Sequence, residues 1–214
     1  MFDEDRIHSP WPVADQRGAA RVNMLIRPAK LITRGGEFLC VLRDVSNGGC
    51  KVRLFHPLPH PGAMVLELGN GDRYEVEAVW ERDDHAGLRF TRPVPVEYVV
   101  NEEGPYRKRP VRLRLSLPAL LVAGREAIPV MLRDLSQQGA QIACEARLAV
   151  DQTVRLEIDS VPSIVAKVRW RRADSLGLVF EQTFRLDEFA RLAARLQPAP
   201  PSTEDDGLPL PRLA

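Results

Sequence analysis

The sequence predicts an all-β protein built from two small antiparallel barrels in tandem. The first observation is a repeat, because residues 43–49 (RDVSNGG) return as residues 133–139 (RDLSQQG). The second is that the sequence downstream repeats at the same interval of 90 positions, so that Trp80 and Gly87 return as Trp170 and Gly177. The third is a series of short alternating apolar runs separated by turn residues. A period of this length fits a small duplicated domain rather than a solenoid unit.

Six short strands are expected in the first half, which is typical of a small barrel. Pro28 interrupts the run 24–33, so this strand is expected at an edge or at a bulge. The bend at 46–49 is expected to need the positive φ of glycine. Trp80 and Trp170 lie in alternating apolar runs, and we expect them in the barrel cores rather than on a stacking surface. The other strands of the first half are expected at 38–42, 50–54, 64–68, 74–80 and 86–90.

The second half repeats this plan and then departs from it. Leu186, Phe189, Ala193 and Leu196 share one face at helical spacing, so a helix is expected to close the second barrel. The tail is rich in proline and is expected to be disordered. The sequence thus divides into an irregular leader (1–15), a first barrel (16–94), a linker or short extra strand (95–105), a second barrel with its helix (106–196) and the tail (197–214).

Composition excludes several classes of protein. The 214 residues are 44% hydrophobic and 28% charged, with a net charge of +1, so no overall basic field draws the chain to nucleic acid. Cys40, Cys50 and Cys144 do not recur at equivalent positions, so we expect buried thiols in a reducing compartment, not a disulfide or a zinc site. The chain shows neither a signal-peptide pattern nor 18 uninterrupted apolar residues, which favours a cytoplasmic protein without membrane insertion.

Catalytic and metal chemistry find little support in the residues. All four histidines lie in the first half, and prolines separate His56 from His60, so no metal site is expected. Ser46 and Ser136 recur without a recurring histidine or lysine base, which argues against nucleophilic catalysis. No phosphate-binding G-x-x-x-x-G-K-[ST] loop is present. We therefore expect a protein without enzymatic activity and without a cofactor.

One set of residues in the first half suits a guanine nucleotide: Arg17, Arg21, Asp44, Ser46 and Gly49. Guanidinium groups can bind phosphate or the O6 and N7 acceptors of guanine, and a carboxylate can accept from its N1–H and N2–H₂ groups. The alternative is a surface salt bridge between an edge arginine and Asp44, worth at most about 1 kcal/mol.

These residues resemble the PilZ domain family, a six-stranded barrel that binds the bacterial second messenger cyclic di-GMP. The family's R-x-x-x-R segment corresponds to Arg17 and Arg21, and its [DN]-x-S-x-x-G bend corresponds to Asp44, Ser46 and Gly49. The resemblance implies that the arginines bind guanine and phosphate, that the aspartate reads a guanine edge, and that the serine assists near phosphate. It also implies that the glycine lets the backbone approach the ligand. It covers both halves of the chain.

The second copy keeps Asp134, Ser136 and Gly139 but departs from the arginine pattern. Arg112 matches the second arginine if one residue is lost, and Lys108 then stands where the first arginine is expected. Lysine lacks the planar fork of arginine, although Arg107 could compensate. We expect this second site to be weaker than the first or silent, and the basic run 107–114 to be either part of that site or a solvated linker.

The sequence therefore predicts a bacterial cyclic di-GMP receptor that passes ligand occupancy to a protein partner by rearrangement. Because the run 107–114 lies at the junction, a bound dianion could change how the barrels meet. The alternative is a protein-interaction adaptor in which one or both barrels do not bind nucleotide. A nucleic-acid-binding barrel is disfavoured by the net charge near zero.

Overall fold

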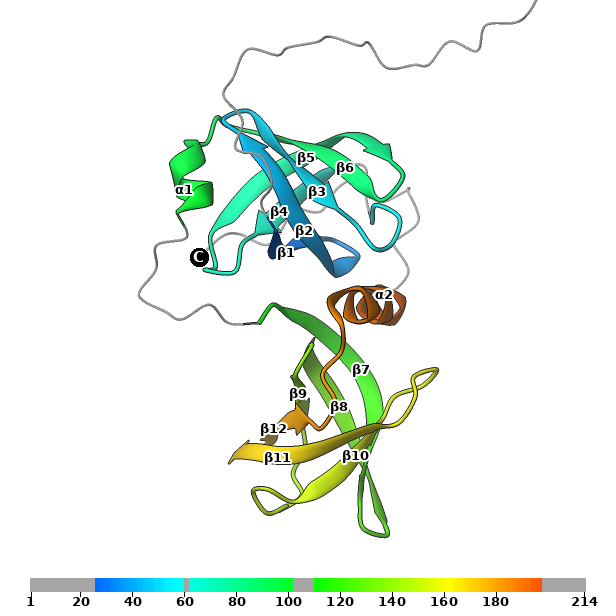
Figure 1. The fold of residues 1–214 in the computed structure, drawn as a ribbon. Coiled ribbons are helices and arrows are strands. Elements are labelled where there is room, and N and C mark those ends of the chain that lie inside the picture. Colours follow the sequence, from blue (N-terminus) through cyan, green and yellow to red (C-terminus); the bar gives the residue numbers. More distant parts are fainter. Residues whose placement is uncertain (1–25, 60–61, 102–109, 198–214) are drawn as a thin grey trace, which may run out of the picture.

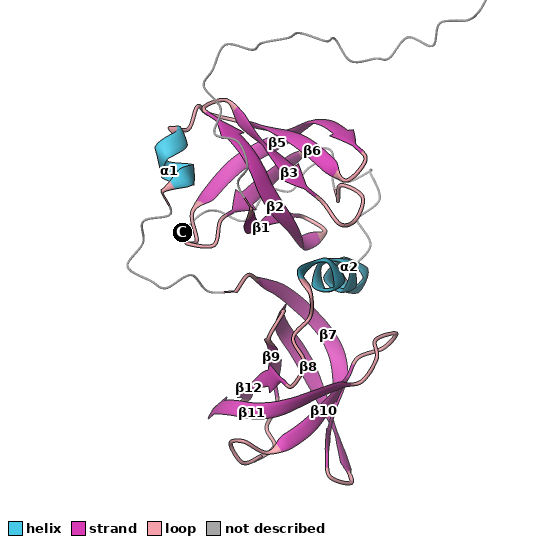
Figure 2. Ribbon diagram, viewed as in Figure 1, coloured by secondary structure: helices cyan, strands magenta, loops and turns pink. Residues whose placement is uncertain are grey.

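The computed structural model describes residues 26–59, 62–101 and 110–197. Two closed antiparallel barrels of six strands each lie one after the other, with a single helix after each barrel (Figures 1 and 2). This confirms the predicted all-β class, the two tandem barrels and the C-terminal helix. The leader and residues 198–214 of the tail lie outside the described residues.

The first barrel, hereafter barrel 1, closes in the order β1-β2-β3-β6-β5-β4. Pro28 lies in β1, which pairs with β2 along its length and with β4 only from Lys30 to Ile32. The expectation of an edge strand is therefore wrong, because a closed barrel has no edge, and the proline lies where β1 has only one partner. The strands are β1 (Arg27–Thr33), β2 (Gly36–Ser46), β3 (Gly49–Arg53), β4 (Ala63–Glu67), β5 (Arg73–Arg82) and β6 (His85–Phe90).

The second barrel, barrel 2, has the same strand order. Each strand of barrel 1 has its counterpart six strands later, so the repeat in the sequence is a repeat of topology. The strands are β7 (Arg112–Ala123), β8 (Glu126–Ser136), β9 (Gly139–Ala143), β10 (Thr153–Glu157), β11 (Ile164–Arg172) and β12 (Ser175–Phe180).

Each barrel is filled by the apolar side chains that alternate along its strands. Leu31, Leu42 and Leu66 are fully buried in barrel 1, and Leu121 and Leu156 in barrel 2. Each such leucine contributes roughly 1.5–3 kcal/mol on burial. The three cysteines are buried and unpaired, as expected.

A short helix, α1 (Val96–Val100), occupies the segment expected to be a linker or an extra strand. Val99 is fully buried against the core of barrel 1, and its carbonyl accepts a hydrogen bond of 2.9 Å from Arg27 Nη1. These contacts explain the difference, because the valines of this segment continue the core of barrel 1 instead of spanning to barrel 2.

The predicted C-terminal helix, α2 (Leu186–Leu196), is confirmed. It lies between the barrels and packs against β2 as well as against barrel 2 (Figure 1). Leu39 of β2 belongs to the same buried cluster as Phe189 of α2. The helix therefore joins the two barrels rather than only closing the second. Neither helix of the described residues is long and apolar enough to cross a membrane.

Candidate functional site

The two recurring bends are held by matching hydrogen bonds from a serine hydroxyl to a glycine carbonyl. In the first bend (residues 44–49), the Ser46 hydroxyl donates to the Gly49 carbonyl at 3.2 Å. The Gly48 carbonyl accepts from the amide of Phe90, the last residue of β6, at 3.0 Å. In the second bend (residues 134–139), the Ser136 hydroxyl donates to its own glycine carbonyl at 3.0 Å. Each serine therefore stabilises its own turn.

The recurring glycines serve close packing and not an unusual backbone conformation. Within the described residues, positive φ occurs at other glycines and not at Gly49 or Gly139. A Cβ at Gly49 would overlap the Leu88 carbonyl of β6, and a Cβ at Gly139 would overlap the Leu178 carbonyl of β12. The expectation of positive φ is therefore wrong at these positions, and glycine is required because a neighbouring strand passes so closely.

A β-bulge places each aspartate of the bends on the outside of its barrel. The β2–β3 register shifts between Leu42 and Asp44, so Arg43 has no opposite partner. Arg43 and Asp44 are both partly exposed, although the residues before and after them are buried. The same shift precedes Asp134 in β8. Bulges commonly re-aim a side chain in this way.

A row of residues crosses the outer face of barrel 1 from the first bend. Asp44 is opposite Lys51, Lys51 is opposite Gly87, and Gly87 is opposite Trp80. Trp80 is 44% exposed, so the expectation of a core position is wrong. The register shift between Ala78 and Trp80 turns this side chain outward, and its indole lies over Gly87, which has no side chain in the way.

Barrel 2 has the corresponding row, with two differences. The position of Lys51 is taken by Gln141, which removes a positive charge between Asp134 and Gly177. Trp170 lies over Gly177, but the Arg172 guanidinium is 5.6 Å from its ring centroid. A cation of the protein itself therefore already lies on this ring.

In the second bend, the aspartate forms an ion pair with an arginine. Arg112 Nη1 is 2.7 Å from Asp134 Oδ1, with side chains 52% and 18% exposed. The strand register supports this approach, since Arg112 is opposite Ser136. An ion pair with one half-exposed partner is worth about 1 kcal/mol or less, so a ligand with better hydrogen-bonding groups can replace it.

The structure places seven of the predicted site residues. Asp44, Ser46 and Gly49 come together in the first bend, and Arg112, Asp134, Ser136 and Gly139 in the second. Ser136 is only 1% exposed, so its hydroxyl is engaged in the turn. Arg17, Arg21, Arg107 and Lys108 lie outside the described residues. Sequence reasoning missed the outward Trp80 and also Lys51, on the other side of Gly87. The recurrence of Trp and Gly at one interval was a usable signal for Trp80.

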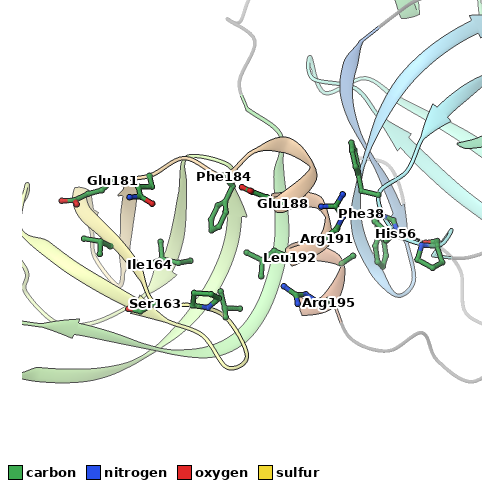
Figure 3. Close-up of a pocket in the computed structure, with 17 residues that line it drawn as sticks. Phe38, His56, Ser163, Ile164, Glu181, Phe184, Glu188, Arg191, Leu192 and Arg195 are labelled. Carbon is green, nitrogen blue, oxygen red and sulfur yellow. Dashed lines mark hydrogen bonds between the residues drawn. The ribbon is translucent and has the colours of Figure 1, made fainter. Parts of the chain in front are cut away.

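A cavity of about 980 Å³ lies elsewhere, where the two barrels and α2 meet (Figure 3). Phe38 and His56 line it from barrel 1, Ile164 and Phe184 from barrel 2, and Leu192 from α2. No residue of either bend lines this cavity. The described residues of the two bends therefore lie apart from this cavity.

Residues 26–59, 62–101 and 110–197 contain no group of three or more histidine, cysteine or acidic side chains placed to hold an ion.

A family model described as the PilZ domain matches residues 15–100 and again residues 106–196. The chain is similar to the Borreliella burgdorferi PlzA protein in complex with c-di-GMP (cyclic di-GMP), with 12% identity over 81% of this chain and 94% of that chain and a TM-score of 0.32. It is also similar to the Bacillus subtilis inhibitor of motility MotI/DgrA, with 13% identity, coverage of 80% and 95% and a TM-score of 0.35. Escherichia coli YcgR in complex with c-di-GMP shows 13% identity, coverage of 80% and 84% and a TM-score of 0.31. The search of curated proteins found no match.

Proposed function

We propose, from the premise that this chain belongs to the PilZ domain family, that it is a receptor for cyclic di-GMP. The observation that carries the proposal is the placement of Asp44 and Asp134. In both barrels a bulge turns the aspartate outward beside a serine–glycine bend. In barrel 2 an arginine lies beside this aspartate, so the two kinds of side chain that can bind a guanine nucleotide occur together.

The first bend offers the better surface for a guanine base. Asp44 can accept from the N1–H and N2–H₂ groups of guanine, and Arg17 and Arg21, which precede the barrel, supply guanidinium groups for phosphate and for the O6 and N7 acceptors. Lys51 adds a positive charge next to Asp44. The exposed indole of Trp80 lies in the same row and provides an aromatic face for stacking.

The second bend binds the same ligand more weakly in this proposal. Its ligand must first displace Arg112 from Asp134, and the ring of Trp170 already has Arg172 against it. Arg107 and Lys108, together with Ser136 and Gly139, complete this second set. Because Arg112 and Asp134 are already paired with each other, the other candidate function for barrel 2 is also supported, in which this barrel binds a protein rather than a nucleotide.

Ligand occupancy reaches a protein partner through the junction between the barrels. The basic run 107–114 ends in the first residues of β7, so a dianion bound there acts directly on the segment that joins the barrels. The proposed protein has no enzymatic activity and works in the cytoplasm.

Calorimetric titration of cyclic di-GMP tests the receptor. We expect the wild type to bind at micromolar concentrations, Arg21→Ala to weaken the stronger site by about tenfold or more, and Arg112→Ala to affect only the weaker site. Arg125→Ala, an exposed arginine in the β7–β8 turn, is the matched control and is expected to bind like the wild type. A wild type that releases no heat would reject the receptor and favour the adaptor.

A further inference from the structure

A buried cluster of charges lies where barrel 1 meets the start of β7. Lys30 and Glu37 are 7% and 6% exposed, and their charged groups are 2.9 Å apart. Lys30 Nζ also lies 3.0 Å from Glu67 Oε1 and donates to the Arg112 carbonyl at 3.3 Å. Its three N–H groups therefore have three acceptors, one of which belongs to barrel 2.

Glu37 makes the second link to β7. Its Oε2 accepts the Lys30 bond and a further bond of 2.9 Å from the Arg114 amide. The carbonyl of Glu37 accepts from Gln197 Nε2, at the end of α2, at 2.7 Å. One residue of barrel 1 therefore contacts both the first strand and the final helix of the second half.

These bonds take the place of a neighbouring strand. In an extended strand, the carbonyl of one residue and the amide two residues later point to the same side, and here Lys30 and Glu37 satisfy both. β10 pairs with β7 further along, from Leu120 to Val122. The start of β7 thus obtains its donor and acceptor from side chains of barrel 1.

The same backbone carries Arg112, whose guanidinium lies on Asp134. We propose that Lys30 and Glu37 are positioning residues for the nucleotide site of barrel 2, because they fix the strand from which Arg112 reaches the second bend. This inference rests on the proposed function. It makes barrel 1 a structural part of the second site, so the isolated barrel 2 lacks a component that its ligand needs.

The chemistry of the cluster supports directed positioning over simple adhesion. Burying charged groups is costly, and apolar residues of similar volume often hold two surfaces together at least as well. An ion pair that also bonds to the Arg112 carbonyl and the Arg114 amide instead fixes where β7 lies along barrel 1. Glu67 also accepts from Arg73 Nε at 2.7 Å, and Arg114 Nε lies 3.8 Å from Glu37 Oε1, so each carboxylate of the cluster has a second cation beside it besides Lys30.

The test measures cyclic di-GMP binding in the full chain with the first site weakened by Arg21→Ala. In this background we expect Lys30→Met to weaken the remaining site by about tenfold, as Arg112→Ala does. Lys167→Met removes an exposed lysine of β11 and is the matched control, with unchanged affinity expected. Glu37→Gln, which keeps an acceptor but loses the charge, is expected to cause a smaller loss and serves if Lys30→Met does not fold.

A charge reversal separates positioning from charge pairing. Lys30→Glu combined with Glu37→Lys restores an ion pair, but lysine cannot accept the Arg114 amide bond. We expect the double variant to recover melting temperature relative to Lys30→Glu alone while its second site stays weak.

Three results would overturn the inference: unchanged second-site affinity in folded Lys30→Met or Glu37→Gln, wild-type-like binding by the reversed pair, or no residual binding in Arg21→Ala. Each of these leaves the first site standing. Absence of binding by the wild type rejects the proposed function itself.

Discussion

At the scale of single residues, each recurring residue of the bends has a distinct physical task. Asp44 and Asp134 are turned outward by bulges, while Ser46 holds its turn through a hydrogen bond to a glycine carbonyl. Gly49 allows β6 to pass close to β3, because a Cβ there would overlap the Leu88 carbonyl. A residue that a motif associates with ligand can therefore be required first by the fold.

We expect Gly49→Ala to lower the free energy of unfolding by about 1–3 kcal/mol, since the added methyl group meets a backbone oxygen that cannot move alone. Gly48→Ala, one residue earlier in the same turn, has no atom within 4 Å of its Cβ and no positive φ. Its expected change is within about 1 kcal/mol of zero. Urea denaturation of both variants provides the comparison, and equal stabilities would contradict this account of the glycine.

At the scale of elements, α2 is the clearest case of one pattern with two roles. Apolar residues recur in its sequence at helical spacing and form one face, on which Phe189, Ala190 and Ala193 are buried. The Glu188 carboxylate accepts from the Arg185 amide at 3.1 Å and so satisfies a donor at the start of the helix. The same helix contacts β2 of barrel 1, so its burial stabilises both barrel 2 and the junction.

We expect Phe189→Ala to cost about 3–5 kcal/mol of stability, because it empties a fully buried aromatic site. Arg195→Ala, on the exposed side of the same helix, is expected to change stability by about 0.5 kcal/mol or less. Thermal unfolding of the full chain measures both. A loss in Phe189→Ala no larger than in Arg195→Ala would show that α2 does not support the core.

At the scale of the whole molecule, two barrels of one topology carry unequal sites and meet at a junction of mixed character. The buried Lys30–Glu37 pair and α2 tie the barrels together, while a cavity of about 980 Å³ lies between them. The basic start of β7 lies at this junction, and Arg112 is engaged by both halves, through its carbonyl and its guanidinium. A ligand that draws Arg112 from Asp134 therefore acts where the barrels meet.

We expect saturating cyclic di-GMP to change the small-angle scattering profile of the wild type, because the barrels reorient when the junction is neutralised. The double variant Arg21→Ala with Arg112→Ala is the control, and its profile is expected to stay the same with and without ligand. Identical wild-type profiles at saturation would reject the rearrangement.

The candidate site was predictable from sequence in its parts more than in its geometry. The recurring motif identified the aspartate, serine and glycine of both bends, and the shifted alignment identified Arg112, which the structure brings to Asp134. The roles of Arg17, Arg21, Arg107 and Lys108 stay predictions. Trp80 was assigned to the core because alternation alone does not reveal a bulge, and one extra residue moves a side chain to the opposite face.

The sequence by itself determined the features that depend on local periodicity and on the repeat: twelve strands in two equal sets, the C-terminal helix and the burial of the cysteines. Tertiary structure alone decided the features that depend on neighbours distant in the chain. Glycine is required in the first bend because a strand about 40 positions later passes close to it, and Lys30 bonds to a carbonyl 82 positions away. Periodicity tells which face of a strand is apolar, but only the closed barrels and their junction determine what that face meets.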